Sequence, residues 1–169
     1  GCYKAFWAHG EPMQVAGKDQ VRFQSIIWQA MLKSANLTPT HRVFYHGFIT
    51  SGGQKMSKSI GNVISPYELV ERYGTEATRY LLLRHVHSFE DTDITWERLD
   101  EWYNAHLANG LGNLVSRVMK MAEDNLDAPV EIKEQPLEEA FTAKLDAFRF
   151  DEAFDIVFSH IGKGDSHIQ

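Results

Sequence analysis

A strand, a helix and a second strand follow one another early in this sequence, and this order restricts the fold more than any other feature. Residues 13–16 form a short apolar run that stops at Gly17-Lys18-Asp19, which is typical of a strand that ends in a turn. Apolar residues recur every three or four positions over residues 21–35, which predicts an amphipathic helix. Arg42–His46 then has the composition of a buried strand.

This order of elements favours a right-handed unit whose two strands are parallel. In open sheets of that kind, ligands bind beyond the carboxyl ends of the strands. Those ends are Gly17-Lys18-Asp19 and His46-Gly47. We therefore expect a ligand site at these two turns.

A polar stretch over residues 50–59 comes next. Gly52 and Gly53 give it backbone freedom, so we expect a mobile loop. Lys55 and Lys58 can bring two positive charges to a polyphosphate, and the serines at 57 and 59 offer hydroxyl donors. The alternative is a solvated linker with incidental lysines.

The remainder of the chain is predicted to be mainly helical. Ser65, Pro66 and Glu68 form a capping pattern, so a helix should run from there to about Tyr73 and end at Gly74.

Two further helices are expected in the middle of the chain. Thr75 can cap a helix over about 77–86. Thr95 begins the longest helical stretch, to about residue 125, with a bend or a close helix contact expected at Gly110 and Gly112.

The C-terminal part predicts a linker and two more helices. The linker covers residues 127–135, and Pro136 starts a helix toward residue 148. Asp151 can cap a last helix. Its apolar face would carry Phe154, Val157, Phe158 and Ile161.

The charge distribution indicates where an anion would bind. The 169 residues include 17 Lys and Arg against 23 Asp and Glu, a net charge of -6 that is unusual for a nucleic-acid-binding chain. Basic residues gather between residues 41 and 84, whereas 123–139 is acidic. A phosphate-binding surface is thus expected in the middle of the chain.

Other composition features point to an ordinary cytosolic protein. Cys2 is the only cysteine, which excludes an internal disulfide and a multi-cysteine zinc site. The eight histidines are scattered, so we expect no metal site. No stretch approaches the ~20 apolar residues of a membrane helix, and we expect no export signal. We expect a cytoplasmic protein that does not bind membranes.

The central loop and the two turns resemble the class I aminoacyl-tRNA synthetases. His46-Gly47, Lys55-Met56-Ser57-Lys58-Ser59 and Gly61-Asn62-Val63-Ile64 are similar to the KMSKS signature of that family and its surroundings. Gly17-Lys18-Asp19 with Arg22-Phe23 resembles the methionyl branch. So does the later Asn109-x-x-Gly112-Asn113-Leu114-x-Ser116-Arg117.

The resemblance implies roles for individual residues. Lys55 and Lys58 would be catalytic, contacting the ATP phosphates together with Ser57. Gly17 and Asp19 would hold the ribose, although Asp19 can also be a helix N-cap.

The resemblance further implies an adenine site and a methionine pocket. The backbone of His46, Gly47 and Phe48 would frame the adenine. Phe23 and Gln24 would line the methionine pocket, although plain core packing is the alternative for Phe23. Gln24 departs from the methionyl pattern, which usually has histidine there.

The fold class implied is α/β followed by all-α. Residues 1–50 would be the second half of a Rossmann-like nucleotide-binding fold. Residues 51–100 would carry the KMSKS loop and a stem-contact region, and 101–169 would begin a helical anticodon-binding bundle.

The implied activity is that of a methionine–tRNA ligase. Its substrates would be ATP, with Mg²⁺, methionine and a methionine-accepting tRNA, and no zinc site is expected here. The HIGH signature and the first half of the nucleotide fold are missing from the sequence, so we expect a part of the enzyme that is inactive alone. The alternatives are the leucyl, isoleucyl, valyl or cysteinyl branches, or a non-catalytic synthetase-like module that binds tRNA or protein.

Overall fold

The computed structural model describes residues 2–131 and 133–168. Contacts divide the chain into two compact units. Unit 1 comprises residues up to Phe48 together with Phe89–Asp91, and unit 2 comprises Ile49–Ser88 and the residues from Thr92 onward. The predicted boundaries between functional domains stay a prediction.

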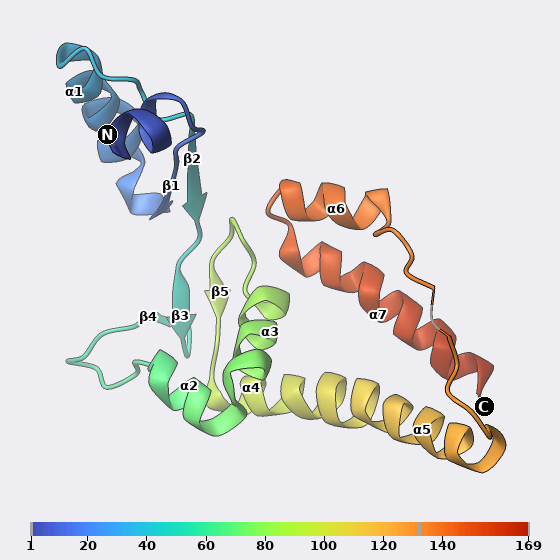
Figure 1. Ribbon diagram of the computed structural model, residues 1–169. Helices are drawn as coiled ribbons and strands as arrows, with labels where there is room; N and C mark the ends of the chain where they lie inside the picture. The colour runs from blue at the N-terminus through green and yellow to red at the C-terminus, as the bar shows by residue number, and fades with distance from the viewer. Residues whose placement is uncertain (1, 132, 169) are drawn as a thin grey trace. The chain divides into compact units, whose positions relative to one another are not determined.

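Unit 1 contains the predicted strand–helix–strand order (Figure 1). The strands β1 and β2 are parallel, with Met13 opposite Arg42 and Gly17 opposite His46, as predicted. The elements are η1 (Tyr3–Ala8), β1 (Met13–Gly17), η2 (Lys18–Gln20), η3 (Phe23–Ile27), α1 (Trp28–Ser34) and β2 (Arg42–His46).

Burial in unit 1 differs from the prediction. The strand β2 is half-buried with exposed ends rather than fully buried, because it pairs with one strand only. Leu32 is buried on α1, but Phe23, Ile26 and Met31 are 55–65% exposed. The apolar face of the helix is therefore formed but mostly uncovered by the described residues.

Unit 2 combines a small sheet with helices. The strand order is β4-β3-β5, with β3 antiparallel to β4 and parallel to β5. Within the described residues, every helix is too short or too polar to span a bilayer. The elements are β3 (Ile49–Ser51), β4 (Gln54–Lys55), α2 (Pro66–Tyr73), α3 (Thr75–His85), β5 (Thr92–Asp93), α4 (Trp96–Trp102), η4 (Tyr103–Gly112), α5 (Asn113–Asn125), α6 (Glu139–Asp146) and α7 (Phe150–His167).

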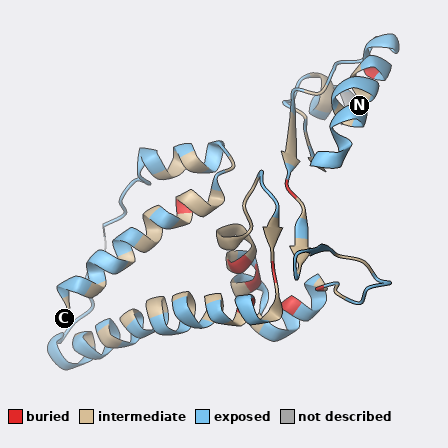
Figure 2. Cartoon of the chain, turned by 180° about the vertical axis from the view of Figure 1, so that it is seen from behind, coloured by how far each residue is buried: buried red, intermediate tan, exposed pale blue. Residues whose placement is uncertain are grey.

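The core of unit 2 lies where α2, α3, α4 and β5 meet (Figure 2). Leu81 and Leu99 are each 1% exposed, and Met56 of the lysine loop packs against the same cluster. The buried members are Ile64, Leu69, Leu81, Ile94 and Leu99.

Several predicted helix ends are confirmed and others are wrong. Ser65 and Glu68 form the capping box of α2, and the Thr95 hydroxyl accepts the Arg98 amide at the start of α4. Thr75 and Asp151 do not cap, because each lies inside its helix.

The start predicted at Pro136 is also wrong. The helix α6 begins at Glu139 after an extended Glu138. No side-chain cap marks that start, so the proline, the strongest local signal, pointed to the wrong residue.

The long helix from α4 through η4 to α5 is continuous, as predicted, but its glycines have a local explanation. The segment η4 is a ten-residue π-helix, in which each amide bonds to the carbonyl five residues earlier. A Cβ at Gly112 would lie 2.8 Å from the Leu107 carbonyl oxygen. This tight backbone, not a bend, requires glycine there.

Helix α7 packs on α3 through its predicted apolar face. Phe154, Val157, Phe158 and Ile161 are all half-buried. The Tyr80 ring meets Phe154 edge-on, with centroids 5.2 Å apart. Arg84 pairs with Asp155 at 2.6 Å and donates to the Asp151 carbonyl at 2.7 Å.

A histidine pair lies beside this contact. The His85 ring stacks on Trp102 and on His106, with centroids 4.2 and 5.0 Å apart. His85 Nε2 and His106 Nδ1 are 3.2 Å apart, so one ring must be neutral to accept the hydrogen bond. Burial lowers the pKa of His85 to about 4, with His106 and Arg84 acting in the same direction. Burial also lowers the pKa of His106.

We expect acid to weaken the histidine contact. The folded chain keeps His85 neutral, whereas the unfolded chain takes up a proton below a pKa of 6.5. The free energy of unfolding should thus fall as the pH drops from 6.5 toward about 4. Thermal melts of wild type and His85→Phe should be measured at about pH 7 and about pH 5. The melting temperature should fall with pH by several degrees less in the variant than in wild type. Equal losses in both proteins would contradict this assignment.

Candidate nucleotide-binding site

The carboxyl ends of β1 and β2 bring together the predicted ribose residues of unit 1. Gly17 and His46 are opposite each other in the register. A Cβ on Gly17 would lie 2.8 Å from Asp19 Oδ1, so the Asp19 carboxylate lies close against the end of β1. Neither η2 nor η3 has a side-chain cap, which is evidence against the alternative that Asp19 is an N-cap.

Gly47 lies where the chain after β2 meets Phe89–Asp91. It is buried, and a Cβ there would be 2.0 Å from the Glu90 carbonyl oxygen. Only glycine allows this approach. The contact is extended by the rings of Phe44 and Phe89, whose centroids are 5.3 Å apart.

Asp91 organises the predicted adenine segment. Its carboxylate accepts hydrogen bonds from the Phe48 amide at 2.8 Å and from Lys18 Nζ at 2.5 Å. These two hydrogen bonds hold the pKa of Asp91 below its usual range, and the bond from Lys18 has the larger effect. The Lys18 ammonium also lies 4.9 Å from the centroid of the Phe48 ring. The backbone of Phe48 is thereby fixed next to the strand ends.

The two predicted methionine residues line one hollow. Phe23 and Gln24 face a volume of about 360 Å³ with Gln14, Ile27, Trp28 and Met31 around it. Gln24 Oε1 and Trp28 Nε1 are buried there without a hydrogen-bond partner among the described residues. Buried polar atoms of this kind cost about 1–3 kcal/mol each when unsatisfied. The hollow is thus apolar with two polar groups available.

The lysine loop of unit 2 contains a hairpin turn that the sequence did not predict. Gly52 and Gly53 have φ of 63° and 72°, which allows the tight turn between β3 and β4, and the mobility expected of this loop stays a prediction. Lys55 ends β4, and Lys58 lies exposed in the turn that follows.

The loop serines are paired with each other. Ser57 Oγ and Ser59 Oγ are 2.8 Å apart. The hydroxyl of Ser57, predicted as a phosphate donor, is thus already in a hydrogen bond that a phosphate would have to replace.

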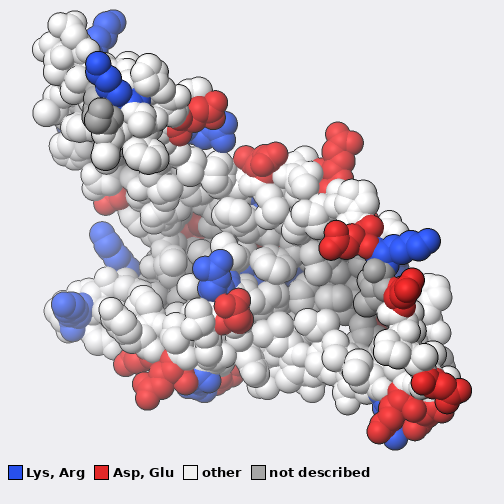
Figure 3. All heavy atoms as spheres, in the orientation of Figure 1, with Lys and Arg blue, Asp and Glu red and all other residues white. Residues whose placement is uncertain are grey.

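Figure 3 shows how charged side chains are distributed over one face of the molecule. Lys and Arg are interspersed with Asp and Glu, and acidic side chains gather over the C-terminal end of α5 (Figure 3). There Lys120 pairs with Glu123 and Asp124 at 3.1 and 3.0 Å. In the described part of the chain, no three His, Cys, Asp or Glu side chains converge as metal ligands would.

The predicted residues therefore form two sets. Unit 1 holds the strand-end residues Gly17, Asp19, His46, Gly47 and Phe48, together with the hollow beside Phe23 and Gln24. Unit 2 holds Lys55, Ser57 and Lys58.

Comparison with known proteins identifies the family. The family model for class I tRNA synthetases (M) matches residues 2–119. This chain belongs to the class I tRNA synthetases of the methionyl type.

Individual relatives agree with that assignment. A methionine–tRNA ligase of Brucella suis is 45% identical over 126 residues, covering 75% of this chain and 24% of that protein. One from Synechocystis is 34% identical over 170 residues, covering 92% of this chain and 32% of its own length.

A solved structure is similar over nearly the whole chain. Mycobacterium tuberculosis methionyl-tRNA synthetase, in complex with methionyl-adenylate, matches with a TM-score of 0.77 at 33% identity. The match covers 92% of this chain and 33% of that one. The predicted fold class, part of a Rossmann-like fold followed by helices, is confirmed. The chain spans about a quarter to a third of the length of these synthetases.

Sequence reasoning missed residues that hold the candidate site together. Trp28 falls within the helix predicted over residues 21–35, but no role was predicted for it. Asp91 and Asp93 lie in a short segment without a recognisable pattern. The amides that they hold, those of Phe48 and Gly53, are 40 or more positions away, so no local signal for these two bonds exists.

We expect Gly47→Ala to disturb the segment predicted to frame the adenine. The added methyl group should displace Phe89–Asp91 and cost about 1–3 kcal/mol. Amide exchange of Phe48, measured by NMR, should accelerate because its bond to Asp91 is lost. Gly162→Ala is the control, since nothing lies within 4 Å of that position in α7. An unchanged Phe48 amide in Gly47→Ala would show that the contact tolerates a side chain.

Proposed function

We propose that this chain is the part of a methionine–tRNA ligase that carries the lysine loop, and that the whole enzyme forms methionyl-adenylate from methionine and ATP. The observation that carries the proposal is the Lys55-Met56-Ser57-Lys58-Ser59 string on a turn anchored to the unit 2 core by Met56, in a chain of the methionyl family. The presence of both lysines favours a ligase over a non-catalytic module. The family match favours the methionyl branch over the leucyl, isoleucyl, valyl and cysteinyl branches.

Unit 1 would bind the nucleoside and the amino acid. Asp19 beside Gly17 would accept hydrogen bonds from the ribose hydroxyls, and the backbone of His46, Gly47 and Phe48 would frame the adenine. The close approach at Gly47 and the Phe48–Asp91 bond support this role, because they fix that backbone.

The hollow beside Phe23 would take the methionine side chain. Its apolar wall suits a thioether. The unsatisfied Gln24 Oε1 and Trp28 Nε1 support a ligand with polar atoms nearby.

The lysine loop would act on the triphosphate. The methionine carboxylate attacks the α-phosphorus, the bond from that phosphorus to the bridging oxygen breaks, and pyrophosphate leaves with the electron pair. Lys55 and Lys58 would stabilise the charge that develops on pyrophosphate, and Ser57 would donate to it. Mg²⁺ would enter bound to the triphosphate, since it is held mainly through substrate phosphates and water.

In the second step, a hydroxyl of the tRNA attacks the methionyl carbonyl and AMP leaves. In this proposal residues 51–100 contact the acceptor stem and 101–169 begin the anticodon-binding bundle.

A cytoplasmic location is part of the proposal, although an Arabidopsis relative is named as chloroplastic/mitochondrial.

We predict that Lys58→Ala in the full-length enzyme lowers the rate of adenylate formation by roughly 10²-fold, as for the loss of one charge-stabilising donor. Methionine and ATP affinities should change much less, because the charge on pyrophosphate develops in the transition state. Single-turnover measurement isolates this step.

Lys163→Ala, on the exposed side of α7, is the matched control and should form adenylate at the normal rate. A normal rate in Lys58→Ala would remove the role assigned to that lysine. Lys55→Ala should act in the same direction as Lys58→Ala.

A second prediction concerns residues 1–169 alone. They contain the strand ends and the lysine loop but no HIGH signature, so exchange of pyrophosphate into ATP with methionine present should stay at background. The full-length enzyme assayed in parallel is the control. Clear exchange by the purified 169-residue chain would show that the other half is dispensable.

A further inference from the structure

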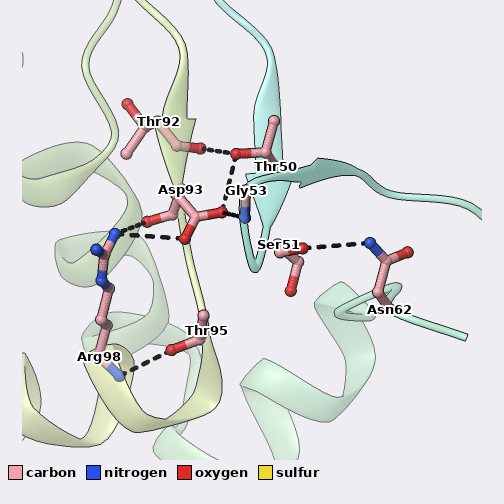
Figure 4. A network of polar contacts seen from close by, with 8 residues as sticks. All are labelled: Thr50, Ser51, Gly53, Asn62, Thr92, Asp93, Thr95 and Arg98. Atoms are coloured by element: carbon pink, nitrogen blue, oxygen red, sulfur yellow. Dashed lines mark hydrogen bonds and ion pairs between the residues drawn. The ribbon is translucent and has the colours of Figure 1, made fainter.

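The carboxylate of Asp93 binds the turn that leads to Lys55. Asp93 Oδ1 accepts the Gly53 amide at 2.7 Å and the Thr50 hydroxyl at 2.9 Å (Figure 4). Its other oxygen faces Arg98 Nη1 at 3.5 Å. The hydrogen bond from the Gly53 amide holds the pKa of Asp93 below its usual range. The hydrogen bond from Thr50 and the charge of Arg98 act in the same direction. The carboxylate is therefore charged at neutral pH, and its hydrogen bonds are of the stronger, charge-assisted kind.

The amide of Asn62 closes the loop from the other side. Asn62 Oδ1 accepts the Ser57 amide at 2.9 Å. Asn62 Nδ2 points to the carbonyls of Ser51 and Lys55, at 3.3 and 3.4 Å (Figure 4 shows the bond to Ser51). One half-buried side chain thus joins the hairpin to the turn that carries Lys58.

That turn has its own internal bonds. The Ser57 carbonyl accepts the amides of Ile60 and Gly61, both at 3.1 Å. With the Ser57 amide bound to Asn62, both backbone polar groups of Ser57 are used. Lys58 is the next residue, so its backbone is held at the start of a closed turn.

We infer that Asn62 and Asp93 are positioning residues for the two lysines of the loop. Asp93 fixes the hairpin turn and so the direction of β4, which ends at Lys55. Asn62 fixes the turn that presents Lys58. This inference rests on the proposed role of Lys55 and Lys58 in adenylate formation. Neither positioning residue is assigned a contact with substrate.

The charges of the loop explain why it needs such support. Lys55 and Lys58 are three residues apart and repel each other, so a loose loop would separate them. Two cations that must meet one leaving group need a backbone that opposes this repulsion. A misplacement of about 1 Å by a change away from the reacting atoms can cost about 10²-fold in rate.

The anchoring is tested first on the 169-residue chain by NMR amide exchange. Asp93→Ala should accelerate exchange of the Gly53 amide, and Asn62→Ala that of the Ser57 amide, each by about 10-fold or more. The matched controls are Asp155→Ala, which removes an ion pair elsewhere in unit 2, and Asn104→Ala, at an exposed position of η4. Both should leave the two loop amides unchanged.

The Leu81 amide, in the core, separates anchoring from general stability. If Leu81 exchanges faster by the same factor as Gly53 or Ser57, the variant has lost stability throughout the unit and the inference is overturned. Unchanged loop amides would overturn it as well. Asp93→Asn and Asn62→Asp keep an acceptor for Gly53 and Ser57, so they should restore slow exchange in large part.

The functional part is tested in the full-length enzyme by single-turnover adenylate formation. Asn62→Ala should lower the rate by about 10-fold, with the dissociation constants of methionine and ATP within about 2-fold of wild type. Asp93→Ala should act in the same direction, and Asn62→Asp and Asp93→Asn should recover part of the rate.

A double variant separates this inference from the proposed function. Because Asn62 acts through Lys58, Lys58→Ala with Asn62→Ala should be no slower than Lys58→Ala alone. Additive losses would show an independent structural effect and overturn the inference. A normal rate in Lys58→Ala would defeat the proposed function itself. A slow Lys58→Ala beside a normal Asn62→Ala would defeat only the positioning role.

Discussion

The apolar contact among Ile64, Leu69, Leu81, Ile94 and Leu99 is the core on which the lysine loop packs. Ile64 follows the loop closely, and Ile94 is the neighbour of Asp93. Met56, in the middle of the KMSKS string, packs on the same cluster. The hydrogen bonds of Asp93 and Asn62 therefore act between segments that the core has already brought near each other. Without that core, the loop would have to pay its ordering entropy alone.

Unit 1 has a different balance. Its parallel strand pair places Gly17 beside His46 and so makes the strand-end site, but two strands and one helix cannot bury much apolar surface. Phe23, Ile26 and Met31 stay more than half exposed. The precision of this unit comes instead from close contacts and polar bonds, namely the approach of Gly47 to Glu90 and the Lys18–Asp91–Phe48 group.

The sequence predicts best those structural features that depend on residues close together along the chain. The strand–helix–strand order, the Ser65–Glu68 capping box and the Thr95 cap follow from neighbours within four positions, and all three are confirmed. The signature residues of the loop were also found from the sequence. Their roles stay a prediction.

The features that the sequence did not predict depend mainly on contacts between residues far apart along the chain. Asp91 and Asp93 accept amides from positions 48 and 53, which no local pattern reveals. The Gly52-Gly53 pair was interpreted as a source of mobility, which stays a prediction, and the bond from Gly53 to Asp93 in the same turn was not foreseen. A local signal also failed at Pro136. Proline is a strong helix starter, but this helix begins at Glu139.

The ten-residue π-helix between α4 and α5 has a consequence for tolerance to insertions and deletions. A π-turn contains one residue more per hydrogen-bonded ring than an α-turn. Removing one residue between Tyr103 and Gly112 would return part of η4 to α-helical bonding, and this change would absorb the missing residue without turning α5. Arg117 would then stay beside Asp165, its partner on α7 at 2.8 Å. The π-helical segment can therefore lose one residue and still leave α5 facing α7 in the same orientation.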